Sequence, residues 1–369
     1  MNIKSVVIIY NATHHVLLFK SELIKSIREN GYRVVVLASK DNYTKNLLDI
    51  VDEFHEIKLN SSGVNPVKDL ILIFNIYTLL KKINPFVVLN FTIKPVIYGT
   101  LASRLINAPA INTITGLGTA FISKGLTNRI VRLLYSFTLR FSHLVFFQNP
   151  DDQQFFKDLK IISRNNTKLI SGSGVDLLRF SPKKNKKRRE VKILFIGRII
   201  ADKGIKELID AAKIIKREFS DVTFTLMGMV GVNNKTSISQ SQIDNWVEKG
   251  IIEFIPFKDD VRGVLGDSDL VVLPSYREGT PKTLIEAASM AKPLIATDVP
   301  GCREVVNDGV NGFLCKVKNS NSLANQIRRF IKLDYSTKIE MGLKSRQLAV
   351  EKFDIVKVNN CYINEIKQI

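Results

Sequence analysis

The sequence predicts an α/β protein made of two doubly wound domains. Its 369 residues exceed what one hydrophobic core usually supports. Hydrophobic residues make up 45% and charged residues 24%, a balance typical of globular proteins and not of disordered or fibrous ones. In each half, short apolar runs alternate with amphipathic helical segments, which is the pattern of parallel sheets covered by helices on both faces.

The first half opens with a strand and continues in strand–helix order. The expected strands are 5–10, 33–39, 86–92 and 109–115, and the expected helices are 17–30 and 96–106. The first apolar run is short and no small-residue cleavage site follows it, so we interpret it as a strand and not as a signal peptide.

The second half repeats this order. The expected strands are 192–197, 222–228, 251–257, 269–274, 292–298 and 312–316, and the expected helices are 204–219 and 281–291. Because ligands of open parallel sheets bind beyond the carboxyl ends of the strands, we expect the chemistry at those ends.

The domain boundary is predicted at a basic segment. Six of the seven residues 183–189 are Lys or Arg, and the segment follows Pro182 and precedes a new strand. We therefore expect domains at 1–182 and 191–350 with a linker at 183–190. A helix in 351–369 is expected to pack back toward the first domain.

The charge balance predicts an anionic partner. Lys and Arg number 54 against 35 Asp and Glu, a formal charge of +19. Nucleic acid, an anionic membrane and phosphorylated metabolites all satisfy such a charge. The excess lies in the first half and in 183–189, which favours a membrane surface over nucleic acid.

Cysteine content and hydropathy limit the cellular setting. The three cysteines, Cys302, Cys315 and Cys361, are odd in number and form no disulfide framework, which indicates a reducing compartment. No stretch approaches 18 uninterrupted apolar residues, so we expect no membrane span.

The segment 269–291 carries the strongest functional signal. A strand runs into the loop 275–279 and then into a helix, with Thr280 as the expected N-cap and Pro281 in the first turn. Free N–H groups at such a helix start bind anions, and Gly279 would let the backbone approach a phosphate closely.

Two glutamates flank this expected anion site. Glu278 precedes the helix and Glu286 lies within it. A carboxylate beside a phosphate is repelled unless it holds a neutral group, so sugar or ribose hydroxyls are the expected ligands. The alternative is a capping glutamate and a solvated helix glutamate.

At this point the sequence resembles a known family. Glu278-x7-Glu286, preceded by LPSYREG, is similar to the signature of the family 4 (group 1) retaining glycosyltransferases, which have the GT-B fold. Segments 174–182, 195–215 and 300–314 also match it. Segments 61–70, 91–105 and 112–135 resemble a narrower group of bacterial enzymes, which add a hexose or N-acetylhexosamine to undecaprenyl-diphosphate-linked sugars in O-antigen, capsule or related surface polysaccharide synthesis.

The resemblance implies two Rossmann-like domains facing across a cleft, with a UDP-sugar as donor substrate. Arg198 and Lys203 match the family's diphosphate clamp, which agrees with their position after the strand 192–197. Glu278 would contact the donor sugar and complete the catalytic set. The implied front-face mechanism has no enzymic nucleophile, and the leaving phosphate assists deprotonation of the acceptor.

The remaining donor-side residues follow from the same resemblance. Glu286 would hold the ribose hydroxyls, and the backbone of Gly279 and Thr280 would hold phosphate. Phe257 and Lys258 stand where the family holds the base.

The first domain is expected to bind the acceptor. Many family members have a glycine-rich first loop and a later histidine, but here residues 10–15 contain no glycine and Thr115 stands at the histidine position. The candidate acceptor-side residues are therefore Thr13, His14, Thr115, Gly116 and Gly118. A lone histidine is more often structural than functional, so His14 keeps both interpretations.

Residues 121–140 predict an amphipathic basic helix. Lys124, Arg129, Arg132 and Arg140 lie among apolar side chains, a composition that suits the interface of an anionic leaflet. The alternative is an ordinary domain helix with solvated charges. A polyprenyl-linked acceptor favours the first, so we expect a cytoplasmic enzyme peripherally associated with the inner face of the bacterial plasma membrane.

No cofactor or essential metal is expected, since no His/Cys cluster has zinc spacing and cationic side chains would neutralise the diphosphate. Two other functions stay open at this point. One is a sugar-nucleotide 2-epimerase or hydrolase on the same fold, and the other is a non-enzymatic basic protein that binds membranes or polyanions.

Overall fold

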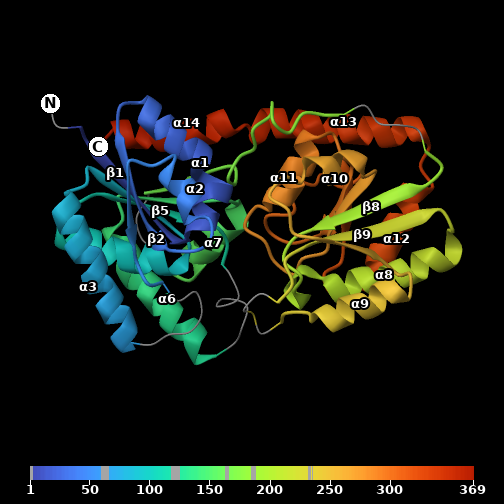
Figure 1. Ribbon diagram of the computed structural model, residues 1–369, viewed down its shortest axis with the longest axis horizontal. Helices are drawn as coiled ribbons and strands as arrows, with labels where there is room; N and C mark the ends of the chain where they lie inside the picture. The colour runs from blue at the N-terminus through green and yellow to red at the C-terminus, as the bar shows by residue number, and fades with distance from the viewer. Residues whose placement is uncertain are drawn as a thin grey trace. The chain divides into compact units, whose positions relative to one another are not determined.

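The computed structural model describes residues 3–59, 66–117, 125–162, 166–183, 188–231, 234 and 236–369. The chain divides into two compact units (Figure 1). Unit 1 is Met1–Ser173 with Ile355–Ile369, and unit 2 is Gly174–Asp354. Each unit contains a parallel sheet covered by helices, so the predicted fold class of two Rossmann-like domains is confirmed.

In the part of unit 1 that the structure describes, seven strands form one parallel sheet in the order β3-β2-β1-β4-β5-β6-β7. The strands are β1 (Ser5–Ala12), β2 (Arg33–Ser39), β3 (Glu53–Glu56), β4 (Val87–Phe91), β5 (Ala110–Ile114), β6 (Leu144–Phe147) and β7 (Thr167–Leu169). The helices are α1 (Thr13–Glu29), α2 (Thr44–Leu48), α3 (Pro66–Ile83), the π-helix η1 (Pro95–Gly99), α4 (Thr100–Leu105), α6 (Leu126–Thr138), the 3-10 helix η2 (Leu139–Phe141), α7 (Pro150–Asp158) and α14 (Ile355–Lys367).

The alternation of side chains along β1 explains the two cores of unit 1. Val6 and Ile8 point into a cluster with apolar residues of α1 and α14. Val7 and Ile9 point to the opposite face, into a cluster formed with α3, η1, α4, α6 and α7. Both faces are therefore buried, which is why the strands are continuous apolar runs.

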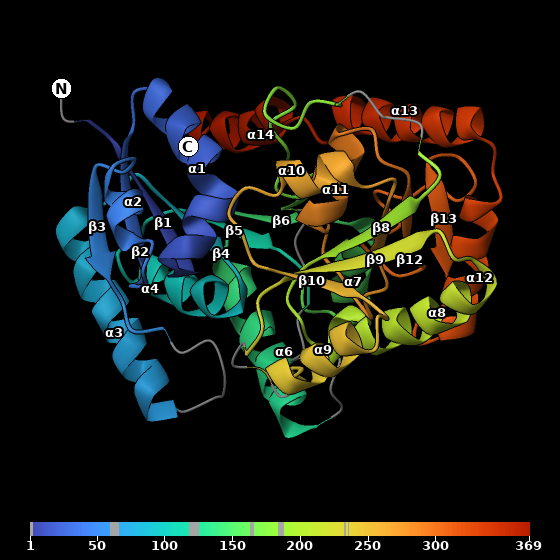
Figure 2. The same ribbon diagram turned by 45° about the vertical axis from the view of Figure 1, so that its right-hand side comes forward.

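Unit 2 repeats the architecture with six parallel strands among its described residues, in the order β10-β9-β8-β11-β12-β13. The strands are β8 (Val191–Ile196), β9 (Val222–Gly228), β10 (Glu253–Pro256), β11 (Leu270–Leu273), β12 (Leu294–Thr297) and β13 (Gly312–Cys315). The helices are the 3-10 helix η3 (Ala201–Lys203), α8 (Ile205–Glu218), α9 (Gln240–Glu248), α10 (Arg262–Asp267), α11 (Lys282–Ser289), α12 (Ser320–Ile331) and α13 (Tyr335–Lys352). Figure 2 shows α8 and α9 on one side of this sheet and α10, α11 and α13 on the other.

Several elements differ from the sequence prediction. Strands β3, β6 and β7 were not predicted. Strands β3 and β7 are short and rich in polar residues, whereas β6 is a short apolar run, LVFF, that the prediction missed. The first helix begins at Thr13 rather than at residue 17. The helix expected over 96–106 begins as the π-helix η1 and only then becomes the α-helix α4.

The predicted domain boundaries are corrected by the packing of Gly174–Pro182. This segment belongs to unit 2 and not to the first domain. Val175 pairs with Asp354, and the Arg346 guanidinium donates hydrogen bonds to the carbonyl oxygens of Leu177 and Phe180 at 3.1 and 3.2 Å. Residues 184–187 of the expected linker lie outside the described residues.

The C-terminal helix α14 packs within unit 1. The hydroxyls of Tyr362 and Thr113 lie 3.0 Å apart, and Lys168 Nζ lies 2.5 Å from Glu365 Oε1. Tyr362 also packs edge-to-face against Phe146, with the two ring centroids 5.0 Å apart. Residues distant in sequence therefore complete one face of the first sheet.

Candidate functional site

The candidate donor site lies at the carboxyl edge of the unit 2 sheet. Strand order reverses between β8 and β11, since β8 continues outward to β9 while β11 continues to β12 on the other side. Such a reversal is where open α/β sheets bind ligands, because the loops after the two strands diverge to opposite faces. The loop after β8 carries Arg198 and Lys203, and the loop after β11 carries Glu278 and Gly279.

Lys203 and Glu278 are brought into direct contact. Lys203 Nζ forms a short ion pair with Glu278 Oε1, and the two side chains are only 18% and 11% exposed. The backbone fixes both partners, because the N–H of Tyr276 donates to the carbonyl oxygen of Asp202 at 2.9 Å. Burial strengthens this attraction and makes removal of either charge costly.

Two glycines hold the Glu278 loop close to its neighbours. Gly204 has φ +72, and a Cβ there would collide with the carbonyl oxygen of Pro274. Gly301 has φ +79, and a Cβ there would collide with the carbonyl oxygens of Gly279 and Glu278. Both positions need glycine for its backbone conformation and for the close approach it permits.

The start of α11 differs from the expected cap. Pro281, with φ −73 and ψ 117, is the N-cap residue, and the helix begins at Lys282. Thr280 is therefore not the N-cap: its hydroxyl donates to the carbonyl oxygen of Gly279 at 2.9 Å instead of accepting from a helix N–H. The N-terminal end of α11 has no side-chain cap, so its backbone N–H groups remain oriented toward the loop.

Glu286 is buried, which removes the alternative of a solvated helix glutamate. It is 7% exposed, and its Oε1 lies 3.6 Å from Lys282 Nζ one turn earlier. Burial raises the pKa of Glu286, and the positive charges of Lys282 and Arg179 oppose that shift. Burial likewise lowers the pKa of Lys282, against the effect of Glu286. A buried carboxyl with a nearby cation behind the α11 N-terminus is suited to hydroxyl recognition.

The other donor-side candidates are Arg198, Phe257 and Lys258. Arg198 is exposed, and its guanidinium has no partner among the residues that the structure describes. Phe257 and Lys258 follow β10, the outer strand of the sheet, with β9 between β10 and β8. Phe257 is half-buried and Lys258 is exposed.

The carboxyl edge of the unit 1 sheet has a switch point of its own, between β1 and β4. The pairing register of β1 with β2 shifts between Ile9 and Ala12, so β1 bulges just before it ends. Within this irregular segment, Asn11 Oδ1 accepts a 2.8 Å hydrogen bond from the Thr92 hydroxyl after β4. Thr92 has φ +70, an unfavourable conformation for a β-branched residue.

The predicted acceptor-side residues lie along this same edge. Thr13 and His14 form the first turn of α1, directly after β1, and Thr115 and Gly116 follow β5. Gly116 has φ +120. Gly118 and Lys124 lie outside the described residues.

Three contributors to this edge were missed in the sequence: Asn11, Thr92 and Asp41. Asp41 follows β2 and contacts both Thr13 and His14. The available signal was a polar residue directly after an apolar strand, but no spacing rule links residue 41 to residue 14. Their contact depends on β1 and β2 being adjacent in the sheet.

Among the described residues, no group of three or more His, Cys, Asp or Glu side chains is arranged to hold a metal ion. Within the same part of the chain, no helix is both long enough and apolar enough to cross a bilayer.

Comparison with known families places each half of the chain. Residues 178–347 match the family described as Glycosyl transferases group 1, and residues 7–149 match the family described as Glycosyl transferase 4-like. The chain belongs to these glycosyltransferase families. The resemblance identified in the sequence is thereby confirmed, and the enzyme is a transferase.

Curated relatives of this glycosyltransferase match it over most of its length. It is 25% identical over 350 residues to the N,N'-diacetylbacillosaminyl-diphospho-undecaprenol alpha-1,3-N-acetylgalactosaminyltransferase of Campylobacter jejuni, covering 90% of each chain. It is 26% identical over 326 residues to the UDP-Gal:alpha-D-GlcNAc-diphosphoundecaprenol alpha-1,3-galactosyltransferase of Escherichia coli, covering 82% of each.

Solved structures show that the glycosyltransferase has the GT-B fold. The Anabaena protein Alr3699/HepE in complex with UDP-glucose superposes with a TM-score of 0.81 at 20% sequence identity, over 99% of this chain and 100% of that one. A glycosyltransferase from Rickettsia africae gives a TM-score of 0.78 at 21% identity, over 100% and 99%.

Proposed function

We propose that this enzyme transfers a hexose or N-acetylhexosamine from a UDP-sugar to an undecaprenyl-diphosphate-linked saccharide, with retention of anomeric configuration, in O-antigen, capsule or related surface polysaccharide synthesis. The observation that carries the donor half is the buried Lys203–Glu278 pair at the unit 2 switch point, with Arg198 exposed on the same loop as Lys203. The acceptor half is supported by the two relatives above, whose names specify diphosphoundecaprenol-linked acceptors and alpha-1,3 products.

The donor edge suggests how transfer would proceed. Negative charge develops on the leaving diphosphate as the glycosidic bond breaks, and Arg198 and Lys203 would neutralise it. Glu278 would accept hydrogen bonds from donor-sugar hydroxyls while Lys203 holds its carboxylate in place. Glu286 would hold the ribose hydroxyls, and backbone N–H groups at the start of α11 would hold phosphate.

The direct test is intact-mass analysis of a synthetic polyprenyl-diphosphate-linked N-acetylhexosamine incubated with the enzyme and a panel of UDP-sugars. We expect one donor to add a single hexose or N-acetylhexosamine mass and to release UDP only when the acceptor is present. UDP release that is independent of acceptor would instead indicate a hydrolase, and isomerised donor without transfer would indicate an epimerase. Either result would refute the proposal.

We further propose that the cationic side chains, and not a metal ion, neutralise the diphosphate. Transfer should then continue at its full rate in excess EDTA. A loss of activity in EDTA that Mg²⁺ or Mn²⁺ restores would contradict this part of the proposal.

We also propose that α3 and α6 bind the enzyme to an anionic membrane at the cytoplasmic face. Both helices cover the same face of the unit 1 sheet, and each exposes apolar side chains beside basic ones. The exposed apolar residues are Val67, Leu70, Ile71 and Phe74 on α3 and Leu133, Phe137 and Phe141 on α6 and η2, each between 36% and 70% exposed. The exposed basic residues on these elements are Lys68, Lys81, Lys82, Arg129 and Arg140.

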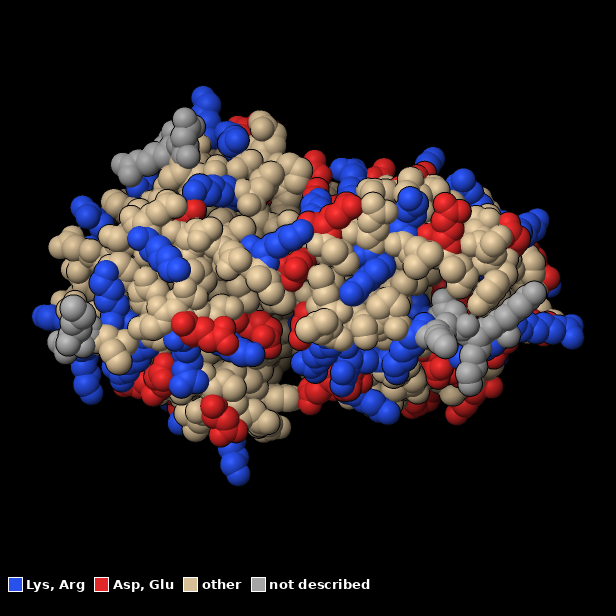
Figure 3. All heavy atoms as spheres, turned by 90° about the horizontal axis from the view of Figure 1, so that it is seen from above, with Lys and Arg blue, Asp and Glu red and all other residues tan. Residues whose placement is uncertain are grey.

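Apolar side chains that enter the headgroup region, flanked by cations, are the requirements of interfacial binding. By contrast, the face drawn in Figure 3 has Lys and Arg spread over both units and interspersed with Asp and Glu. The combination of apolar and basic exposure on α3 and α6 is what favours a membrane surface over nucleic acid.

Vesicle co-sedimentation tests this surface. The double variant Leu70→Glu/Phe74→Glu should bind vesicles containing anionic lipid about tenfold less tightly than the unmodified enzyme, because two apolar side chains are lost and two like charges added. Leu343→Glu on α13, where the leucine is 57% exposed, is the matched control and should leave binding nearly unchanged. Equal losses in both variants would refute the assignment to α3.

A further inference from the structure

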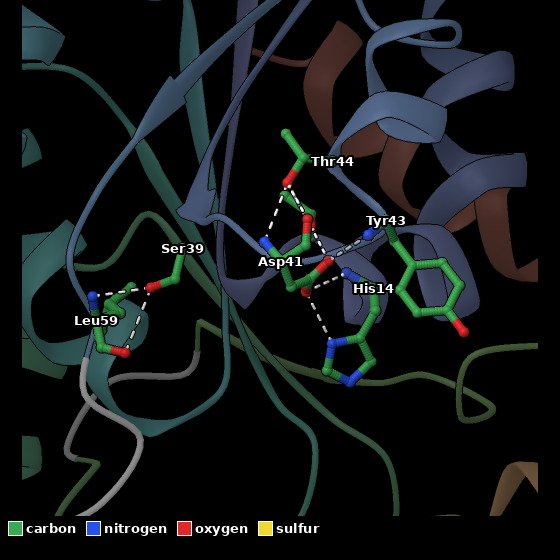
Figure 4. Close-up of polar contacts among 7 residues, drawn as sticks. His14, Ser39, Asp41, Tyr43, Thr44 and Leu59 are labelled. Carbon is green, nitrogen blue, oxygen red and sulfur yellow. Dashed lines mark hydrogen bonds and ion pairs between the residues drawn. The ribbon is translucent and has the colours of Figure 1, made fainter. Parts of the chain in front are cut away.

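The His14 imidazole is held by a carboxylate from a different strand–helix loop (Figure 4). His14 Nδ1 lies 2.9 Å from Asp41 Oδ2. The backbone N–H of His14 donates to the same oxygen at 2.9 Å, so the ring and its main chain share one acceptor. The imidazole is therefore fixed in orientation at the start of α1.

Asp41 is itself tightly held as an anion. Its Oδ1 accepts hydrogen bonds from the Thr13 hydroxyl and from the N–H of Tyr43, the latter at 2.8 Å. Partial burial would raise the pKa of Asp41, but the hydrogen bonds from Thr13, His14 and Tyr43 outweigh it and lower the pKa to about 2. A carboxylate in this position makes Nδ1 the protonated nitrogen of a neutral His14 ring.

In that tautomer the remaining nitrogen of the ring, Nε2, is a hydrogen-bond acceptor. Figure 4 shows Nε2 of His14 on the side of the ring that points away from Asp41. Within the described part of the chain, this atom has no hydrogen-bond partner. The side chain is 31% exposed, so a ligand can reach it.

The contact between Asp41 and the His14 imidazole is not needed to cap α1. The Thr13 hydroxyl and the His14 N–H already bring Asp41 to the helix start, and that function needs no imidazole. His14 also stands three residues after Asn11, whose contact with the strained Thr92 marks the unit 1 switch point. The groups gathered there are hydroxyls and amides, which recognise neutral hydroxyl groups.

We propose that Nε2 of His14 accepts a hydrogen bond from a sugar hydroxyl of the acceptor saccharide, and that Asp41 is the positioning residue that fixes the required tautomer and ring orientation. The inference rests on the proposed function, since it names the part of the acceptor that unit 1 recognises. It assigns to Asp41 a role in acceptor binding.

Three single variants separate this role from a structural one. His14→Asn keeps an amide that can donate to Asp41 but places no atom at Nε2, so acceptor KM should rise about tenfold while donor KM is unchanged. His14→Gln returns an amide oxygen toward the Nε2 position and should recover part of the loss. Asp41→Asn should raise acceptor KM by a similar factor, because its amide can donate to Nδ1 and favour the wrong tautomer.

The double variant His14→Asn/Asp41→Asn tests whether Asp41 acts through His14. If it does, Asp41→Asn adds no further increase in acceptor KM once Nε2 is absent. A full additional increase, or equal changes in donor and acceptor KM, would show that Asp41 serves only to hold the fold and would overturn the proposal.

Binding measured without turnover separates this inference from the proposed function. Calorimetry with a short-chain polyprenyl diphosphate carrying one N-acetylhexosamine should show about tenfold weaker binding to the His14→Asn variant than to the unmodified enzyme. That result together with no transfer from any UDP-sugar would refute the proposed donor and retain the role of His14. Unchanged binding, or no binding to the unmodified enzyme, would overturn the role of His14.

Discussion

The carboxyl edges of the two sheets have the same topology and different chemistry. In unit 2 the switch point gathers charge, with Lys203 and Glu278 paired and Lys282 and Glu286 close together behind the loop. In unit 1 the neutral side chains of Asn11 and Thr92 pair at the switch point, and the carboxylate of Asp41 orients His14. The fold therefore supplies the position of a site, and the residues after the strands determine which part of a substrate it suits.

The two edges also differ in how the backbone is constrained. Unit 2 uses glycines with positive φ to bring loops into contact, as at Gly204 and Gly301. Unit 1 places the β-branched Thr92 at φ +70, where glycine would be relaxed. Close approach of neighbouring loops therefore shapes the unit 2 edge, whereas the unit 1 edge has a strained backbone at Thr92, a residue that provides a hydroxyl.

The largest effect should come from Glu278→Gln. Loss of the carboxylate removes the proposed donor-sugar contact and leaves the Lys203 ammonium unpaired, so we expect kcat to fall about 10² to 10³-fold. Steady-state kinetics with saturating acceptor measures this, and circular dichroism controls for folding. Transfer within threefold of the unmodified rate would contradict a charged donor edge.

Arg198→Ala should lower kcat about 10²-fold without loss of stability. The Arg198 side chain is exposed and forms no hydrogen bond or ion pair within the described residues, so its removal should change the free energy of unfolding by less than about 0.5 kcal/mol. Kinetics and thermal unfolding on the same preparation test both parts. Full activity would remove Arg198 from the diphosphate site.

Gly301→Ala tests whether close approach shapes the donor edge. The new Cβ would press on the carbonyls of Gly279 and Glu278, and φ +79 adds strain, so we expect a loss of about 3 kcal/mol and a raised donor KM. Gly309→Ala is the matched control, because Gly309 has φ +75 but open space around it. It should cost only about 1 kcal/mol and leave donor KM unchanged.

Equal losses of stability in Gly301→Ala and Gly309→Ala, measured by chemical denaturation, would show that backbone strain alone explains the requirement for glycine. The role of close packing at the donor edge would then be rejected.

Much of the fold was predictable because the buried strands can be recognised in the sequence as continuous apolar runs. Continuous Val, Ile and Leu runs at β1, β2 and β11 are the direct result of burial on both faces of a parallel sheet. The misses at β3 and β7 follow the same logic, since β3 reads EFHE and β7 reads TKL, and neither is an apolar run. The miss at β6 differs, because its four apolar residues LVFF are too few to distinguish a strand from a helix segment by periodicity. Edge strands pair through their backbone, which the sequence pattern does not reveal.

The candidate donor site at the unit 2 edge was partly predictable from the sequence, and the candidate acceptor site at the unit 1 edge was much less so. Glu278, Gly279 and Glu286 follow one another along the chain, so their spacing carries the signal. The contact of Asp41 with His14 joins two loops, and the strain at Thr92 is a property of the backbone. The contact and the strained conformation both arise only when the sheet is folded, so a sequence pattern does not reveal them.

Asp41→Asn gives a smaller effect with a pH signature in unit 1. The pKa of Asp41 is lowered to about 2 from an ordinary value near 3.8, so its ionised form stabilises the native state above pH 4. This contribution is lost as the pH falls toward 2. The stability difference between the unmodified enzyme and Asp41→Asn should therefore be largest at pH 6 and shrink between pH 4 and pH 2 in urea titrations. A difference that stays constant with pH would contradict the role of Asp41 as a hydrogen-bonded anion.

The smallest effect compares one strained residue in each unit. Ala291 has φ +55 and follows Met290, the C-cap residue of α11, at the position where glycine is preferred, so Ala291→Gly should stabilise the protein by about 0.5 to 1 kcal/mol with unchanged kinetics. Thr92→Gly relieves a similar strain but loses the hydrogen bond to Asn11, so the two contributions should nearly cancel in stability. Acceptor KM should nevertheless rise in Thr92→Gly, because Asn11 loses the partner that orients it beside α1. A clear gain in stability with unchanged acceptor KM would show that the Thr92 hydroxyl contributes nothing to acceptor binding. The backbone strain at Thr92 would then have no role in binding a ligand.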